Sequence, residues 1–116
     1  MVEPYIKDNE IAVLISPGFG AGWSTWNVSE VAYDKRIIEV FMDYLDNKID
    51  YDHLCEVIEG FGYKDLYYGG LAEGKIRWIP CGIYFRIREY DGAESIEYLS
   101  DTGFLCGLTT GKVQYL

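Results

Sequence analysis

The part of the chain that decides the fold is an apolar run and the loop after it, Ile11-Ala12-Val13-Leu14-Ile15 and then Ser16-Pro17-Gly18-Phe19-Gly20-Ala21-Gly22-Trp23-Ser24-Thr25-Trp26-Asn27. The continuous apolar run predicts a strand over residues 9–15 that is buried on both faces. Pro17 and Gly18 end this strand. Glycine permits tight turns and close backbone approach, and tryptophan adds a large apolar face with one polar tip. We call residues 16–27 the Gly/Trp loop and expect it to cradle a flat polar molecule or to contact a neighbouring subunit.

Two amphipathic helices are predicted after this loop. In the first, apolar residues recur at spacings of three and four and gather on one face: Ile37, Ile38, Phe41, Tyr44 and Leu45. Asp34 or Ser29 can cap its first turn. Asp50 can cap a second, shorter helix, which Gly60 and Gly62 end. This helix is expected to turn a second set of residues inward: Tyr51, Leu54, Cys55 and Ile58.

The second half of the chain has the alternating pattern of strands. We expect strands over residues 65–68, 75–79, 83–90, 95–99 and 112–116. The clearest hairpin turns at Asp91-Gly92-Ala93-Glu94. Pairing Tyr90 with Ser95 places Arg88 opposite Glu97 and Ile87 opposite Tyr98 on the other face. The fold class predicted from this order is α+β, a single domain over residues 1–116 in which an antiparallel meander carries two helices on one face.

Composition excludes several classes of protein. The chain has 116 residues and a formal net charge of −9, which argues against general binding to nucleic acids or anionic membranes. It has no apolar run long enough to span a bilayer and no secretory signal, so we expect a cytoplasmic protein. Cys55, Cys81 and Cys106 are predicted to be unpaired buried thiols, and with His53 as the single histidine we expect no metal site and no cofactor.

The charge is unevenly distributed along the chain. Residues 28–66 contain ten acids and four bases, whereas residues 67–90 contain two acids and four bases. Alternation places Arg86 and Arg88 on one strand face with Tyr84 and Tyr90, and it places Lys75 and Arg77 together on the preceding strand. If those strands pair, the four bases converge beside tyrosines, where they can hold a phosphate and stack a base. The alternative is an ordinary solvated face whose arginines pair with Glu97 and Glu89.

No catalytic signature accompanies these features. The glycines of the Gly/Trp loop lack the spacing of a dinucleotide fingerprint, and neither a phosphate-binding loop nor a G-x-S-x-G nucleophile elbow is present. The loop can still offer its backbone N–H groups to an anion as a nest, although a purely structural tight loop is the simpler interpretation. We expect one of Trp23 and Trp26 to lie in the core. Together these observations favour a non-enzymatic protein without catalytic residues.

Two segments resemble those of small acidic accessory proteins from tailed phages and prophages: residues 17–26 and the stretch Phe85-Arg86-Ile87-Arg88-Glu89-Tyr90-Asp91-Gly92-Ala93-Glu94-Ser95-Ile96. The resemblance covers about a quarter of the chain and brings no residue roles with it. It implies expression in the cytoplasm of an infected bacterium. It also implies an antagonist of host defence, which binds a defence protein or sequesters a nucleotide signal at a subunit interface.

The resulting expectation is a homo-oligomeric binding protein for a small, anionic, nucleotide-like ligand. The predicted ligand-binding residues are Gly20, Gly22, Trp23, Ser24, Thr25, Trp26, Arg86 and Arg88. The glycines permit close approach, a tryptophan stacks, the hydroxyls donate hydrogen bonds and an arginine meets the phosphate. The alternative is an acidic inhibitor of a host defence protein, a nucleic-acid mimic that acts through the first helix and the segment after it: Glu39, Asp43, Asp46 and Asp50. A small hydrolase or a structural accessory protein is the third possibility.

Overall fold

The computed structural model describes residues 2–98 and is built around one central strand, β2 (Glu10–Ile15). β2 pairs antiparallel with β1 (Ile6–Lys7) on one side and with β3 (Lys75–Pro80) on the other. Asp8 and Asn9 adopt positive φ angles of 52° and 63°, which close a two-residue turn between β1 and β2. The sequence pattern predicted β2 and β3 but did not reveal β1, which has two residues.

The Gly/Trp loop contains a short 3₁₀ helix, η1 (Ser24–Trp26), and a second one, η2 (Ser29–Ala32), comes next. Helices α1 (Lys35–Leu45) and α2 (Tyr51–Glu59) follow. The Asp34 side chain caps α1 by accepting a hydrogen bond from the Arg36 N–H, and Asp50 caps α2 through the His53 N–H. Ile37, Ile38 and Phe41 on the inward face of α1 are buried as predicted, whereas Tyr44 is half-buried and Leu45 at the end of the helix is 51% exposed. The spacing of apolar residues and the capping residues therefore predicted both helices.

The hairpin of β4 (Phe85–Tyr90) and β5 (Ala93–Tyr98) forms a separate two-stranded sheet. The predicted register is wrong by two residues: Arg86, not Arg88, lies opposite Glu97, and Tyr90 lies opposite Ala93. The cause is a two-residue turn in which Asp91 and Gly92 have φ angles of 51° and 84°. Asp-Gly favours this turn, so the two residues that follow it enter the strand.

Two other expectations about the strands are wrong. Residues 65–68 form a loop, which leads into η3 (Leu71–Glu73). β3 pairs with β2 and not with β4, so the strands within residues 2–98 do not form one continuous meander, and their pairing does not bring the four bases together. The last predicted strand, residues 112–116, lies outside the described residues, as do Leu99 and Cys106.

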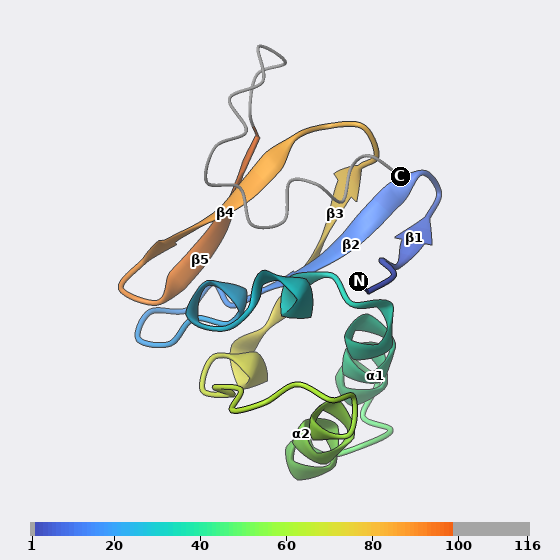
Figure 1. The fold of residues 1–116 in the computed structure, drawn as a ribbon, viewed down its shortest axis with the longest axis vertical. Coiled ribbons are helices and arrows are strands. Elements are labelled where there is room, and N and C mark those ends of the chain that lie inside the picture. The colour runs from blue at the N-terminus through green and yellow to red at the C-terminus, as the bar shows by residue number, and fades with distance from the viewer. Residues whose placement is uncertain (1, 99–116) are drawn as a thin grey trace.

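The described chain stacks in three layers, with the helices and the hairpin on opposite sides of the β1–β2–β3 sheet (Figure 1). Ala12 and Leu14 of β2 pack on the helical side with Phe41. Ile11, Val13 and Ile15 pack on the other side, with apolar residues from η2, β3 and β4: Ala32, Ile79, Phe85 and Ile87. β2 is buried on both faces, as its continuous apolar run predicted. The chain is a small α+β domain with its helices on one sheet face.

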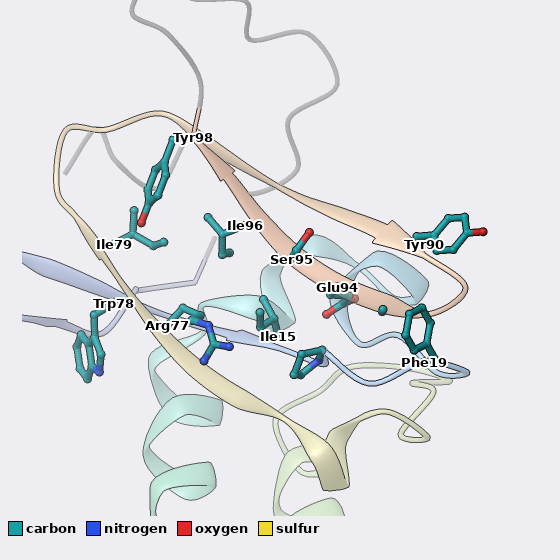
Figure 2. A pocket seen from close by; sticks show the side chains of 12 residues that line it. Ile15, Phe19, Arg77, Trp78, Ile79, Tyr90, Glu94, Ser95, Ile96 and Tyr98 are labelled. Atoms are coloured by element: carbon teal, nitrogen blue, oxygen red, sulfur yellow. The ribbon is translucent and has the colours of Figure 1, made fainter.

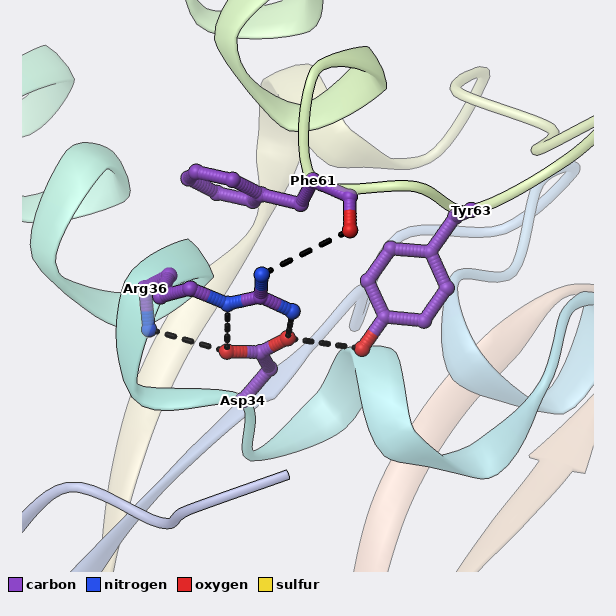
Figure 3. Close-up of polar contacts among 4 residues, drawn as sticks. All are labelled: Asp34, Arg36, Phe61 and Tyr63. Atoms are coloured by element: carbon purple, nitrogen blue, oxygen red, sulfur yellow. Dashed lines mark hydrogen bonds and ion pairs between the residues drawn. The ribbon is translucent and has the colours of Figure 1, made fainter. Parts of the chain in front are cut away.

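A buried carboxylate ties the start of α1 to the loop after α2 (Figure 3). Asp34 is 1% exposed, and it accepts hydrogen bonds from the Arg36 side chain, at 2.7 and 3.1 Å, and from the Tyr63 hydroxyl at 2.7 Å. The Arg36 guanidinium lies 4.6 Å from the centre of the Phe61 ring. Burial raises the pKa of Asp34, but the hydrogen bonds from Arg36 and Tyr63 outweigh burial and hold this pKa below its usual value.

Candidate functional site

The Gly/Trp loop is held in place by one buried carboxylate from the hairpin. Glu94 in β5 is 2% exposed. Its Oε1 accepts a hydrogen bond from the Ser16 N–H at 2.9 Å, and its Oε2 accepts from the N–H groups of Trp23 and Thr25 at 2.7 and 2.9 Å. The Thr25 hydroxyl also donates to Oε2. Four donors from the loop therefore converge on Glu94, which satisfies a charge that would be costly to bury alone.

The backbones of the loop and of the β4–β5 turn are also in direct contact. The Gly20 N–H donates to the Asp91 carbonyl at 2.6 Å, and the Glu94 N–H donates to the Ser16 carbonyl at 2.7 Å. A Cβ atom placed on Gly92 would lie 2.3 Å from the Ala21 nitrogen, so only glycine permits this approach. The two segments singled out by the sequence are therefore neighbours in space.

The loop residues do not have the geometry of the predicted ligand site. Trp23 is fully buried and its indole N–H donates to the Val31 carbonyl at 3.1 Å, so it is the core tryptophan and cannot stack on a ligand. Ser24 is 3% exposed, and Thr25 gives both its N–H and its hydroxyl to Glu94. Gly22 is buried, whereas Gly20 and Trp26 are exposed. The loop does form a nest for an anion, but the carboxylate of Glu94 occupies that nest.

The two predicted arginines pair within the hairpin. The Arg86 Nε donates to Glu97 Oε1, and the Arg88 Nη1 donates to Glu97 Oε2 at 3.1 Å. These hydrogen bonds hold the pKa of Glu97 below its usual value. Phe85 and Ile87 are buried between the layers, so the alternating arginines lie on the outer face of β4. Arg86 and Arg88 therefore form the ion-paired face that was the alternative interpretation of this segment.

Four exposed aromatic side chains gather around the junction of the loop and the turn. Phe19 and Tyr90 are each 75% exposed, and their ring centroids lie 6.5 Å apart. Trp26 and Tyr67 are 43% and 42% exposed, with centroids 5.3 Å apart. We call these four residues the aromatic patch. Such exposed apolar groups are typical of interaction surfaces when they lie close together.

A cavity of about 450 Å³ connects the two aromatic pairs, and we call it the junction pocket. It is lined by Phe19, Gly20, Trp26, Glu89 and Asp91, so both of its charged side chains are acidic. Gly20 and Trp26 are among the predicted site residues, whereas Phe19, Glu89 and Asp91 are not. The Asp-Gly turn is the signal that could have found Glu89 and Asp91, because a two-residue turn would have placed residues 89–91 at the tip of the hairpin.

A longer groove of about 600 Å³ runs between the hairpin and the central sheet (Figure 2). Ile79 of β3 and Ile96 and Tyr98 of β5 line one part of it, and Phe19 and Tyr90 lie at its other end. The Arg77 side chain points into the groove. Arg77 forms no ion pair with any residue between 2 and 98.

The acidic residues of the alternative site lie in the helical layer, away from the aromatic patch. Glu39 and Asp46 are exposed. Asp43 Oδ1 lies 3.9 Å from Lys48 Nζ, and Asp50 caps α2.

Within residues 2–98, no group of three or more His, Cys, Asp or Glu side chains is placed to hold a metal ion. Cys55 and Cys81 are free and half-buried, and burial raises the pKa of the Cys55 thiol. None of the helices in this range is long and apolar enough to cross a membrane.

Comparison with protein families, with curated proteins and with solved structures finds no match to this chain. The class that the fold itself defines is a small α+β domain.

Proposed function

We propose that this protein is a non-enzymatic binding protein that recognises a protein partner through the aromatic patch. The observation that carries the proposal is the outward display of four aromatic rings on a support fixed by a buried carboxylate. Phe19 and Tyr90 have three quarters of their surface exposed. Large aromatic side chains of this kind supply most of the binding energy in many protein interfaces.

The support of the patch is rigid on both sides. Glu94 fixes the loop that carries Phe19 and Trp26. Asn27 fixes Tyr67, because its side chain accepts a hydrogen bond from the Tyr67 N–H at 2.8 Å and donates to the Tyr67 carbonyl at 2.9 Å. A pre-ordered surface loses less conformational entropy on binding, so this hydrogen-bond network favours a role of the aromatic patch in binding a partner.

The proposal is tested by placing a photo-crosslinking phenylalanine analogue at position 19 in the chain expressed in bacteria. Position 45 is the matched control, because Leu45 is also exposed but lies at the end of α1. We expect a discrete crosslinked protein from position 19 that is absent from position 45. Excess unlabelled protein should compete for it, and the double variant Phe19→Ser/Tyr90→Ser should not.

Equal crosslinking from both positions, or none from position 19, would contradict the proposal. A product of twice the chain mass would identify the partner as a second copy, as the expected homo-oligomer requires. A host defence protein would agree with the resemblance to phage accessory proteins. The cytoplasmic location and the phage origin remain predictions.

The predicted anionic ligand remains a second candidate, but at a different place. The groove between β3 and β5 contains Arg77, a cation without an ion pair among residues 2–98, and the aromatic side chains of Tyr90 and Tyr98 also line it. Its volume of about 600 Å³ is within the range of small-molecule sites. Native mass spectrometry of the purified protein tests this candidate. A retained nucleotide that is lost in Arg77→Gln and kept in Trp26→Ser/Tyr67→Ser, which changes residues of the aromatic patch outside the groove, would favour it over the protein partner.

A further inference from the structure

We propose that the junction pocket binds a cationic side chain, an arginine or a lysine, presented by the partner protein. This inference rests on the proposed function, since the pocket lies inside the aromatic patch. It assigns the chemistry of the partner: a basic segment, and not an acidic or purely apolar one.

The pocket combines negative charge with aromatic faces. Asp91 contributes a carboxylate that forms no hydrogen bond or ion pair with any residue of the described chain. Glu89 uses its Oε2 to accept a hydrogen bond from the Gly92 N–H at 2.7 Å, which leaves Oε1 available. Phe19 and Trp26 line the same cavity, so a cation there can meet ring faces as well as carboxylates.

The hairpin register adds a second argument for a missing positive charge. Glu89 lies directly opposite Glu94, so two acidic residues occupy facing positions of the β4–β5 ladder. Like charges at such positions destabilise a sheet. Glu94 is satisfied by loop donors, but neither Glu89 nor Asp91 is neutralised by a cation of the described chain. A bound guanidinium or ammonium group would relieve this repulsion.

The charge of the whole chain favours the same partner. A net charge of −9 attracts basic proteins and repels acidic ones before contact. An arginine matches the pocket well, because a planar guanidinium can pair with a carboxylate and stack on an aromatic ring at the same time.

The test is an NMR titration with a capped arginine, N-acetyl-arginine methylamide, and its neutral analogue, N-acetyl-citrulline methylamide. We expect the arginine compound to shift the Trp26 indole N–H and the Gly20 amide saturably. The Trp23 indole N–H is an internal control, because it is buried and bonded to Val31. Similar shifts with the citrulline compound, or no shift with the arginine compound, would overturn the inference.

The charges are removed by Glu89→Gln/Asp91→Asn, which keeps the acceptor for Gly92, and asparagine tolerates the positive φ at position 91. The matched control, Glu39→Gln/Asp46→Asn, removes two charges from exposed positions at α1. We expect affinity to fall by at least about tenfold in the first variant and to stay within about twofold in the second. Equal losses of affinity in the two variants would show that arginine responds to the net charge of the chain and not to the junction pocket, which would overturn the inference. If position 19 captures a partner but arginine does not bind, the proposed function stands and this inference fails.

Discussion

Glu94 is the residue on which the candidate surface depends most. The Gly/Trp loop has the donors of an anion nest, yet the anion in the nest is a side chain of the same molecule. An internal carboxylate gives the loop a fixed shape without an external ligand. The shape in turn holds Phe19 and Trp26 at the surface.

We expect Glu94→Gln to loosen the loop without unfolding the domain. The glutamine NH₂ group cannot accept the hydrogen bonds that Trp23 and Thr25 now donate to Oε2, so buried donors lose their acceptor. The free energy of unfolding should fall by about 2–3 kcal/mol. Hydrogen exchange of the Trp23 and Thr25 amides should accelerate more than that of the β2 amides. Glu39→Gln, at an exposed position, should leave both measurements unchanged, and unchanged exchange in Glu94→Gln would contradict the role assigned to this carboxylate.

Single residues differed in how far the sequence could predict them. The capping roles of Asp34 and Asp50 were predictable, because a cap contacts backbone groups within three residues. The role of Glu94 was not, because its donors lie 69 to 78 residues away in the sequence. A glutamate beside a hairpin turn is ordinarily solvated, so only the packing of the hairpin on the loop reveals its burial.

At the level of secondary-structure elements, the decisive contact is that of the β4–β5 turn with the Gly/Trp loop. Gly82 and Gly92 offer a matched comparison, because both have positive φ angles, of 90° and 84°. A Cβ atom on Gly82 would meet nothing within 4 Å, whereas one on Gly92 would lie 2.3 Å from the Ala21 nitrogen. We expect Gly82→Ala to cost about 1 kcal/mol from backbone strain alone.

Gly92→Ala should cost about 1–3 kcal/mol more, because the hairpin must also move away from the loop. Chemical denaturation of both variants gives the two values. Intrinsic fluorescence provides a second measurement, since Trp26 lines the junction pocket together with Asp91 of the turn. Equal losses of stability in the two variants would show that the close approach of turn and loop is unimportant.

The elements were predictable to the extent that their signals are local. Periodicity and caps located α1 and α2, and alternation located β3, β4 and most of β5. Strand pairing was not predictable in the same way, because it depends on which apolar faces are buried together. β2 is apolar on both faces, so both faces have to be buried by other elements. The helices pack on one face, and the β4–β5 hairpin packs on the other instead of extending the sheet.

At the scale of the whole molecule, the arrangement of charge bears on the choice between candidate functions. The contrast between acidic and basic stretches is visible in the sequence, but its meaning depends on where the side chains lie. Arg86 and Arg88 pair with Glu97, and the acidic residues at the turn remain without cations in the described chain. The surface at the junction is therefore acidic, which is the reverse of the charge expected for a nucleotide site there.

The acid stability of the molecule follows from its net charge and from Asp34 together. Lowering the pH from neutral reduces the net charge of −9 and with it the self-repulsion of the folded chain, which favours folding. Asp34 acts in the opposite direction, because its pKa in the folded state is lowered by the hydrogen bonds from Arg36 and Tyr63, which outweigh burial. Its contribution to stability is complete above the unfolded pKa of about 3.9, and it is lost as the pH falls through the lower folded value.

We therefore expect thermal stability to change little between neutral pH and about pH 5 and to fall steeply below about pH 4. Asp34→Asn keeps the helix cap at Oδ1, but it places an NH₂ group, which cannot accept hydrogen bonds, where Oδ2 now accepts from Tyr63 and Arg36, and it removes the charge that pairs with Arg36. It should be about 1–2 kcal/mol less stable at neutral pH, a value limited by the half-exposed guanidinium. Its acid transition should be shallower, so the two stability curves should converge at low pH. Circular dichroism melts across the pH range measure both curves, and parallel curves would show that the buried Asp34 carboxylate is not what the acid transition titrates.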